Sequence, residues 1–398
     1  MDNNISRGTN IVGVRAYNDR LVLTLIRKSG KIPKVDIARK TGLSATAVSA
    51  IVNKLEKNKL VKREKLERGR VGQPSMPFSI NAGGAYSLGL KIGRRSSEMV
   101  LIDFLGKVIG IEVLDYSYPK KTSIVQFARK SSRRLYSSLS EDKQKRIAGL
   151  GLAMPDEIWK WQKLFRSPQA NLKEWRNNSH LKTLKQELGL PVFPMNDATA
   201  ACGAELTLNH SFTSSSFIYF FIGWFIGGGI VLDNKLYPGR SDYAGALGSM
   251  LVNDCKGKSR QLIYTSSISA LEEKLFSSGV TADFKWNESA WLTNKSIIDE
   301  WIKESAYGIA QACAAANSVI DFEKIIIDGV MPSHIRTKIF NEIIKQYHQL
   351  DTTGLSGTQF LQGHIGPQAR SIGAACLPLI SSFSPDFDAL FKGIAVPE

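Results

Sequence analysis

A pattern of three short strands that occurs twice along the chain constrains the fold more than any other feature. The strand-like segments are 86–92, 98–102 and 107–114 in the first copy and 216–222, 228–232 and 235–237 in the second. Asp233-Asn234 between the last two segments is a typical hairpin signal. Helical patterns follow each copy. The duplicated β-β-β-α order therefore predicts two similar α/β lobes with a cleft between them.

The length of the chain and one short linker divide it further. A chain of 398 residues is too long for one small core and normally forms two or three compact units. The sequence Asn-Ala-Gly-Gly at 81–84 is typical of a linker. We therefore predict a small domain over 1–80, a first α/β lobe over 81–195 and a second α/β lobe over 196–398.

One stretch, 217–232, is apolar enough to raise the question of a membrane span. It is shorter than the ~20 residues that a spanning helix needs, and it contains Gly223 and the run Gly227-Gly228-Gly229. We interpret it as two buried strands around a glycine loop, and we predict no membrane partner. Residues 1–10 contain no apolar run typical of a signal peptide, and the four cysteines stand far apart. These features predict a reduced, cytoplasmic location.

Three short helical patterns and then two strand-like segments fill the first eighty residues. Their limits are Asn18 or Asp19 to Gly30, 34–40, Ser44 to about Lys57, 60–65 and 77–80. Ser44 is a natural N-cap, because its hydroxyl can accept a free backbone N–H of the first helical turn. A basic loop joins the two strands. This order predicts a winged helix-turn-helix, and a small helical domain with a solvated polar face is the simpler alternative.

The exposed face of the third helix consists of small or polar side chains, which let a helix approach base edges in the major groove. The predicted DNA contacts are Ser44, Ala45, Thr46, Ser49, Asn53 and Lys54 on this helix and Arg68 and Arg70 on the wing. Residues 1–80 hold 17 Lys or Arg and 6 Asp or Glu, so +11 of the formal charge of +16 lies there. Such a concentrated charge suits an anionic partner, either nucleic acid or an anionic membrane surface, and a merely soluble basic protein is the alternative. Together with the helix-turn-helix order, it favours operator DNA. The two wing arginines act either on phosphates or in the minor groove.

Beyond residue 80, a series of short motifs resembles the ROK family of repressors and sugar kinases, which is built on the actin-like, ribonuclease-H-like ATPase fold. The motifs are Gly149 to Pro155, Ser167-Pro168 with Asn171-Leu172 and Trp175, Leu190 to Val192, Asn196 to Ala201, Phe221 to Gly223, Leu236 to Gly239, Ala244 to Gly248, Ile325 to Gly329 and Ser371 to Ala375. The resemblance covers nearly the whole chain. It implies an α/β protein in which a winged helix-turn-helix precedes a two-lobed actin-like body, and the winged N-terminus resembles the repressor branch. For a repressor of this family, the resemblance implies that 196–398 also holds the region for dimerisation and effector binding.

The resemblance also implies a sugar pocket. The family's Asn-Asp pair matches Asn196-Asp197, and in a kinase this Asp acts as general base on the sugar hydroxyl that receives the phosphoryl group. A helix cap ahead of the Ala-rich segment is the alternative interpretation of the same pair, and the two roles are compatible. Asn171 matches a second sugar-contacting position. The ligand-binding candidates are therefore Asn171, Asn196 and Asp197.

Departures from the family pattern argue against catalysis. Family kinases carry an Asp-x-Gly-x-Thr phosphate loop after the first strand, and this chain has Lys91-Ile92-Gly93-Arg94-Arg95 there. Lys91 thus replaces the Asp that positions the metal, and phosphoryl transfer depends on positioned Mg²⁺. The run Gly227-Gly228-Gly229 is open to two interpretations, a second phosphate loop or a tight hairpin between buried strands. We predict no catalytic residues and no cofactor.

The zinc site of the family is also missing from the sequence. The stretch Ala246-Leu247-Gly248-Ser249-Met250 lacks the family's Glu and His, and Cys255 alone remains near the expected cysteine cluster. One cysteine cannot build a tetrahedral structural site, so we predict no metal. The absent Glu and His also contact sugar in the family, which leaves the identity of the effector open.

These observations predict a sequence-specific DNA-binding transcriptional regulator, a repressor of carbohydrate uptake or catabolism genes with an effector-sensing body. Its predicted partners are operator DNA, a carbohydrate or carbohydrate-derived effector, and further copies of the chain in a homodimer or dimer of dimers. Two alternatives stay open. An ATP-dependent sugar kinase with a DNA-binding arm is favoured by Asp197 and opposed by Lys91. The other is a regulator without a small-molecule ligand, whose body serves only dimerisation.

Overall fold

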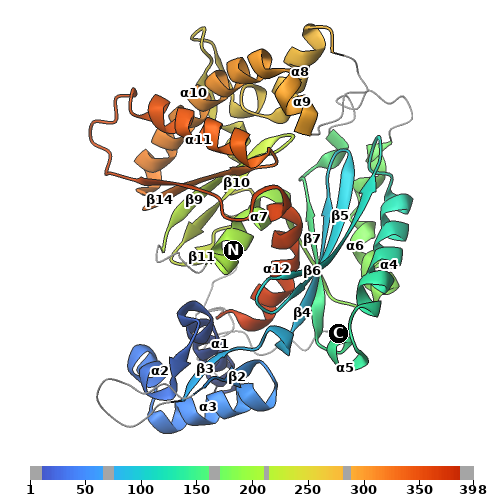
Figure 1. Ribbon diagram of the computed structural model, residues 1–398, viewed down its shortest axis with the longest axis vertical. Coiled ribbons are helices and arrows are strands. Elements are labelled where there is room, and N and C mark those ends of the chain that lie inside the picture. Colours follow the sequence, from blue (N-terminus) through green and yellow to red (C-terminus); the bar gives the residue numbers. More distant parts are fainter. Residues whose placement is uncertain (1–10, 66–75, 161–170, 210–214, 281–287, 386–398) are drawn as a thin grey trace, which may run out of the picture.

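The computed structural model describes residues 11–65, 76–160, 171–209, 215–280 and 288–385. Three parts are visible in Figure 1: a small N-terminal head and, beyond it, two lobes that each contain a five-stranded sheet. The long helix α12 (Ala369–Phe383) runs between the lobes toward the head. The predicted fold class, a winged helix-turn-helix followed by a two-lobed actin-like α/β body, is confirmed.

In its described ranges, 11–65 and 76–80, the head contains three helices and a small three-stranded sheet of order β1-β3-β2. These elements are α1 (Ile11–Ser29), β1 (Ile32–Pro33), α2 (Lys34–Thr41), α3 (Ala45–Lys57), β2 (Val61–Arg63) and β3 (Pro77–Ile80). Gly42 has a φ of 71°, which makes the sharp turn between α2 and α3 possible. Ser44 caps α3 as predicted, because its Oγ accepts the N–H of Ala47 at 3.2 Å.

The start of the first helix was predicted wrongly. Helix α1 begins by Ile11 and passes through Asn18 and Asp19, which were expected to cap it. Asp19 instead accepts an ion pair from Lys54 of α3 at 2.6 Å, which fixes α1 against the third helix. The local capping signal was therefore a tertiary contact, and Gly30 ends the helix as expected, with a φ of 67°.

The first lobe contains a sheet of order β6-β5-β4-β7-β8. Its elements are a 3₁₀ turn (Ala82–Gly84), β4 (Tyr86–Ile92), β5 (Ser96–Asp103), β6 (Val108–Asp115), α4 (Lys121–Ser137), α5 (Glu141–Gln144), β7 (Ile147–Met154), a 3₁₀ turn (Leu172–Trp175), α6 (Ser179–Leu188) and β8 (Val192–Asn196). Strands β4, β5 and β6 are antiparallel, and β7 and β8 run parallel to β4. Helices α4 and α6 cover one face, where Leu88 and Leu90 of β4 are buried.

The second lobe repeats this arrangement in a sheet of order β11-β10-β9-β14-β15. Its elements are α7 (Asp197–Leu208), β9 (Phe217–Ile222), β10 (Ile226–Leu232), β11 (Lys235–Leu236), β12 (Leu251–Asn253), β13 (Ser259–Gln261), α8 (Ile268–Ser277), α9 (Glu288–Thr293), α10 (Lys295–Ile320), β14 (Lys324–Gly329), α11 (Ser333–Tyr347) and β15 (Gln359–Gln362). The 3₁₀ turns there are Leu247–Ser249, Leu262–Tyr264 and Gly366–Gln368. Helices α10 and α11 pack on one face of the sheet and α7 on the other. The duplicated strand pattern is confirmed.

The C-terminal helix α12 packs on the first sheet although it follows the second lobe in sequence. Its close approach depends on glycines. A Cβ on Gly89 of β4 would lie 2.4 Å from the backbone of α12, and one on Gly151 of β7 would lie 1.7 Å from the carbonyl oxygen of Ala374. A Cβ on Gly373 of α12 would lie 2.1 Å from the carbonyl oxygen of Ala200 in α7. Helix α12 is thus clamped between β4, β7 and α7.

The run Gly227-Gly228-Gly229 lies within strand β10 and not in a loop. It pairs with Phe221, Phe220 and Tyr219 of β9, and the turn between the strands lies at 223–225. The missing side chains let α7 approach the sheet, because a Cβ on Gly229 would lie 2.5 Å from that of Cys202. The run is therefore neither a loop nor the hairpin turn itself, and Gly227 and Gly228 line the cavity from within the strand.

The apolar stretch 217–232 forms the antiparallel pair β9–β10. Within the described ranges, no helix has the length and apolar character to cross a bilayer.

Candidate functional site

The exposed face of α3 is the first candidate site. Ser44, Ala45, Thr46, Asn53 and Lys54 are exposed, and Ser49 is half-buried between them. The opposite side of the helix buries Val48, Val52 and Leu55 in the core of the head. Because the core holds the helix along its whole apolar side, the predicted DNA contacts lie together on one free surface. The predicted wing residues Arg68 and Arg70 lie outside the described residues.

Lys34, at the start of α2, also belongs to this surface, and the sequence analysis missed it. Its Nζ donates hydrogen bonds to Ser49 Oγ at 3.1 Å and to Asn53 Oδ1 at 2.9 Å. The ammonium group also lies 5.4 Å from the centre of the Phe78 ring. The spacing of Ser49 and Asn53, one helical turn apart, was the available signal for a shared partner. Lys34 therefore orients two of the predicted base contacts and adds a cation beside them.

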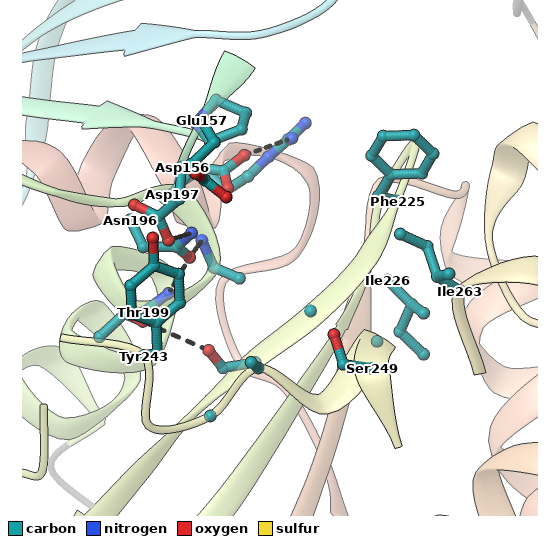
Figure 2. Close-up of a pocket in the computed structure, with 18 of the residues that line it drawn as sticks. Asp156, Glu157, Asn196, Asp197, Thr199, Phe225, Ile226, Tyr243, Ser249 and Ile263 are labelled. Carbon is teal, nitrogen blue, oxygen red and sulfur yellow. Dashed lines mark hydrogen bonds and ion pairs between the residues drawn. The ribbon is translucent and has the colours of Figure 1, made fainter. Parts of the chain in front are cut away.

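The second candidate site is a cavity of about 260 Å³ between the two lobes. Figure 2 shows Asp156, Glu157, Asn196 and Asp197 grouped on one side of it, with Phe225, Ile226 and Ile263 on the other. Thr199, Tyr243 and Ser249 also line it. The volume is slightly below the usual range of ~300–1,000 Å³ for ligand pockets, so the site suits one small polar ligand.

Asn196 lies at the junction of β8 and α7 and has two roles. Its Oδ1 caps α7 by accepting the N–H groups of Ala198 at 3.0 Å and Thr199 at 3.3 Å. Its Nδ2 donates to Asp156 Oδ2 at 2.8 Å. The capping interpretation and the pocket interpretation thus both hold for this residue. Burial raises the pKa of Asp156, the nearby charge of Asp197 raises it further, and the hydrogen bond from Asn196 opposes them.

Asp197 faces the cavity and is paired with an arginine. Its Oδ2 accepts from Nη1 of Arg370 at 3.0 Å, and both side chains are largely buried, with 13% and 14% of their surfaces exposed. Arg370 lies near the start of α12, and its guanidinium is 5.1 Å from the ring centre of Phe221. The carboxylate expected to act as a general base in a kinase is therefore engaged in an ion pair.

Lys91, which replaces the phosphate-loop Asp, is 3% exposed and points into the protein. Its Nζ donates to Glu98 Oε1 at 2.9 Å and to Ser96 Oγ at 3.1 Å. Burial and the positive charge of Arg370 lower the pKa of Lys91, and Glu98 counteracts them. Burial raises the pKa of Glu98, but Lys91 and Arg370 together lower it below its ordinary value. The position that would hold a metal-positioning carboxylate is thus filled by an internal ion pair.

The two arginines that follow connect the lobes. Arg94 Nη1 donates to Glu272 Oε2 of α8 at 3.0 Å, and its guanidinium lies 3.5 Å from the centre of the Trp224 ring. Trp224 Nε1 donates to the same oxygen at 3.1 Å, and Arg95 pairs with Oε1 at 3.4 Å. The β4–β5 hairpin, where family kinases place a phosphate loop, is therefore fastened to the opposite lobe.

The remaining candidates from the sequence are Asn171 and the positions where the family has its zinc ligands. Asn171 is exposed at the start of the 3₁₀ turn Leu172–Trp175 and is not part of the cavity lining. Ala246 and Ser249 line the cavity, and neither offers a metal ligand of the family's type. Cys255 is exposed. Over the part of the chain that the structure describes, no group of three or more His, Cys, Asp or Glu side chains is arranged to hold a metal ion.

A winged helix-turn-helix fixed to a two-lobed body with a cavity between the lobes defines a DNA-binding transcriptional regulator with an actin-like body. Comparison with known families gives the same division. Residues 15–62 match a winged helix-turn-helix DNA-binding family, and residues 87–379 match the ROK family. The chain belongs to the ROK family.

Individual relatives are distant but extend over most of the chain. The xylose repressor of Bacillus subtilis is 23% identical over 365 residues, which cover 85% of this chain and 92% of the repressor. A ROK family transcriptional regulator homologous to the Escherichia coli MLC protein superposes with a TM-score of 0.68 at 18% identity, over 96% of this chain and all of the other. A ROK family glucokinase of Streptomyces griseus, solved with glucose and AMPPNP, gives a TM-score of 0.59 at 20% identity over 74% of this chain and 99% of the kinase. At these identities the two solved structures establish a shared fold.

Proposed function

We propose that this protein is a transcriptional repressor that binds operator DNA through α3 and releases it when a carbohydrate or carbohydrate derivative occupies the cavity between the lobes. The observation that carries the DNA-binding part is the exposed small and polar face of α3, with Lys34 fixed against it. A helix with this surface enters the major groove, where short side chains reach base edges. The wing arginines Arg68 and Arg70 remain proposed contacts.

The chemistry of the cavity supports a carbohydrate. Carboxylates, an amide and hydroxyls converge on a small space, and Tyr243 adds an aromatic ring at its edge. Such groups accept and donate hydrogen bonds to several hydroxyls at once, which suits a neutral polyol better than an apolar ligand. Asn196 and Asp197 are the proposed ligand contacts, and Asn171 is retained only as a weaker candidate. The xylose repressor among the relatives makes xylose the first sugar to test.

The test is a direct measurement of operator binding. Genome-wide mapping of bound DNA supplies the operator, and fluorescence anisotropy then gives its affinity at about 150 mM salt, because affinities for DNA depend steeply on salt. We expect specific binding that falls at least about tenfold, ~1.4 kcal/mol, with one member of a panel of pentoses, hexoses and their derivatives. Asp197→Asn should abolish the response to that sugar. Absence of any DNA fragment bound in preference to random sequence would refute the proposal.

The same site argues against a sugar kinase. Lys91 is held by Glu98, Asp197 is paired with Arg370, and the β4–β5 hairpin is fastened to α8. Phosphoryl transfer needs a positioned metal and phosphate cradle, and these contacts occupy the corresponding places. We therefore expect no ADP release above background when the chain is mixed with Mg²⁺, ATP and xylose or glucose in a coupled assay. Sugar-dependent turnover that Asp197→Asn abolishes would contradict this expectation and favour the kinase alternative.

Two further parts of the proposal concern assembly and location. An operator with two half-sites requires two heads, so we propose that the chain acts as a homodimer or as a dimer of dimers. Operator binding also requires access to the genome, and we propose a cytoplasmic location on that ground. Light scattering of the purified chain, with and without operator, measures the assembly.

A further inference from the structure

We propose that Arg370 reports occupancy of the cavity to the DNA-binding head, with α12 as the connecting element. The inference rests on the proposed function and concerns how the same cavity is coupled to DNA. Helix α12 spans 15 residues, or about 22 Å along its axis. Arg370 in its first turn lines the cavity, and its last turn lies at the head (Figure 1). Arg370 is therefore a positioning residue, which acts on DNA only through the helix.

At the cavity end, α12 is held by two polar contacts. Arg370 pairs with Asp197 at 3.0 Å, and the hydroxyl of the next residue, Ser371, donates to Glu98 Oε2 at 3.0 Å. Glu98 is the partner of Lys91. Arg370 and Ser371 therefore connect the start of α12 to Asp197 in the cavity lining and to the buried Lys91–Glu98 pair of the first lobe. The Nε of Arg370 is buried without a hydrogen-bond partner among the described residues. One N–H of the guanidinium thus lacks a hydrogen-bond acceptor in this conformation, and a second conformation of Arg370 that supplies one can compete with it.

A ligand in the cavity acts on this pair directly. Asp197 lines the cavity, and a hydroxyl that donates to its carboxylate competes with Arg370 for the same oxygens. An occupant therefore weakens the hold of Asp197 on the start of α12. Only a ligand that contacts the two arrangements differently can shift their populations, and this ion pair supplies such a difference.

At the other end, α12 is part of the core that joins head and body. Cys376 and Leu379 of α12 lie in one apolar cluster with Val22 and Ile26 of α1. Arg27 of α1 donates from Nη1 to the carbonyl oxygen of Phe104 at 2.6 Å, and its guanidinium lies 4.4 Å from the Phe104 ring centre.

The Phe104 ring packs edge-on, at 4.7 Å, against Phe383 at the end of α12. Burial lowers the pKa of Arg27 to about 10, so this group stays charged at neutral pH inside the joint. The end of α1 is therefore seated on the end of α12.

The packing along the middle of α12 favours movement of the whole helix over local rearrangement of side chains around Arg370. Gly89, Gly151 and Gly373 bring the backbones of β4, β7 and α7 into direct contact with α12. A helix enclosed in this way cannot absorb a displacement by moving a flexible side chain. A shift at Arg370 is therefore passed along the helix to its joint with α1 in the head.

Lys28, which follows Arg27 in α1, makes the position of the head depend on both lobes. Lys28 Nζ donates to Asn234 Oδ1 in the β10–β11 turn at 2.8 Å, so Arg27 and Lys28 contact different lobes. A change in the angle between the lobes cannot leave both contacts intact.

The experiment compares operator affinity and hydrogen exchange, without any sugar, in Arg370→Gln, Asp197→Asn and the double variant. Each single variant removes the ion pair and should weaken operator binding by about 5–150-fold, the usual range of coupling between two sites. The double variant should be no weaker than the more affected single variant, because all three lack the same contact. The amides of residues 22–28 should exchange faster in all three. Arg370→Lys, which keeps the charge, should restore part of the affinity.

Arg134→Gln is the matched control. Arg134 pairs with Glu112 at the same distance, 3.0 Å, on the outer side of the first lobe. This variant should leave operator affinity and α1 exchange unchanged. Operator affinity within twofold of the unaltered chain in both single variants, with unchanged α1 exchange, would overturn the inference while leaving the proposed function intact. If the unaltered chain binds no operator, the proposed function fails, and the exchange of residues 22–28 in Arg370→Gln still decides the coupling.

Discussion

Gly151→Ala should destabilise the protein more than any other single methyl addition in the body. The added Cβ would lie 1.7 Å from the carbonyl oxygen of Ala374 and 2.5 Å from its carbonyl carbon. The added Cβ has a fixed position on the backbone of β7, and its neighbours are backbone atoms of α12, so no side-chain rotation can relieve the overlap. Excess volume in a close-packed core costs about 1–3 kcal/mol when neighbours can adjust, and we expect at least the upper end here.

The carbonyl group that faces Gly151 is an unusual one. In a regular helix the oxygen of Ala374 would accept the N–H of residue 378, and that residue is Pro378, which has none. The oxygen is therefore free of its helical partner and lies against the glycine of β7. The methyl group of Gly151→Ala would occupy the same space as this carbonyl group and would push the middle of α12 away from the sheet.

Thermal unfolding followed by circular dichroism measures the effect. Gly357→Ala is the control, because a Cβ there meets no atom within 4 Å and its backbone needs no positive φ. The control should unfold within about one degree of the unaltered chain, since neutral surface changes stay within ±0.5 kcal/mol. Equal midpoints for Gly151→Ala and Gly357→Ala would show that α12 does not pack on β7 as described.

The second large effect concerns DNA. Thr46→Glu combined with Ala50→Glu should abolish specific operator binding, with a loss of at least about 100-fold. Both residues are exposed and lie one helical turn apart on the free face of α3, so the changes add two carboxylates where phosphates and base edges must approach. A lost base contact alone costs about 1–3 kcal/mol, and repulsion from the DNA backbone adds to it.

The control for this experiment has the same change in net charge. Gln186→Glu with Gln359→Glu places two carboxylates on exposed positions of the two lobes. Anisotropy at about 150 mM salt should give this control nearly the affinity of the unaltered chain, because both positions lie on the lobes and not on the head, and salt screens exposed charges that are far apart. Retention of specific affinity within threefold by the Thr46 and Ala50 variant would exclude α3 as the recognition helix.

Local patterns in the sequence were sufficient for the element order, the two lobes and the winged head. These features follow from residues whose role is local, such as the Ser44 cap, the Gly42 turn and the Asp233-Asn234 hairpin, both of whose φ angles are positive. Asn196-Asp197 was also found from sequence, because the pair matches a family motif and sits at a strand–helix junction.

The failures all involve contacts between distant segments. Asp19 has the sequence signature of a helix cap, but in the fold it pairs with Lys54 of another helix. The glycine run of β10 has the signature of a loop, but in the fold it makes room for α7. Arg370 stands 173 residues from Asp197, and nothing in its own surroundings marks it. Lys34 was missed because its partners lie on another helix. Such pairings depend on topology, which local propensity does not specify.

The buried pair Lys91–Glu98 also bears on how this molecule could change over generations. A mutation that placed an Asp at position 91 would set two carboxylates beside each other and remove the cation that compensates Glu98. The altered chain would be destabilised even if the new carboxylate could hold a metal ion. A stable carboxylate at position 91 therefore requires a coordinated substitution at position 98. The buried ion pair thus makes positions 91 and 98 interdependent, and we expect stable variants of this chain to change both positions or neither.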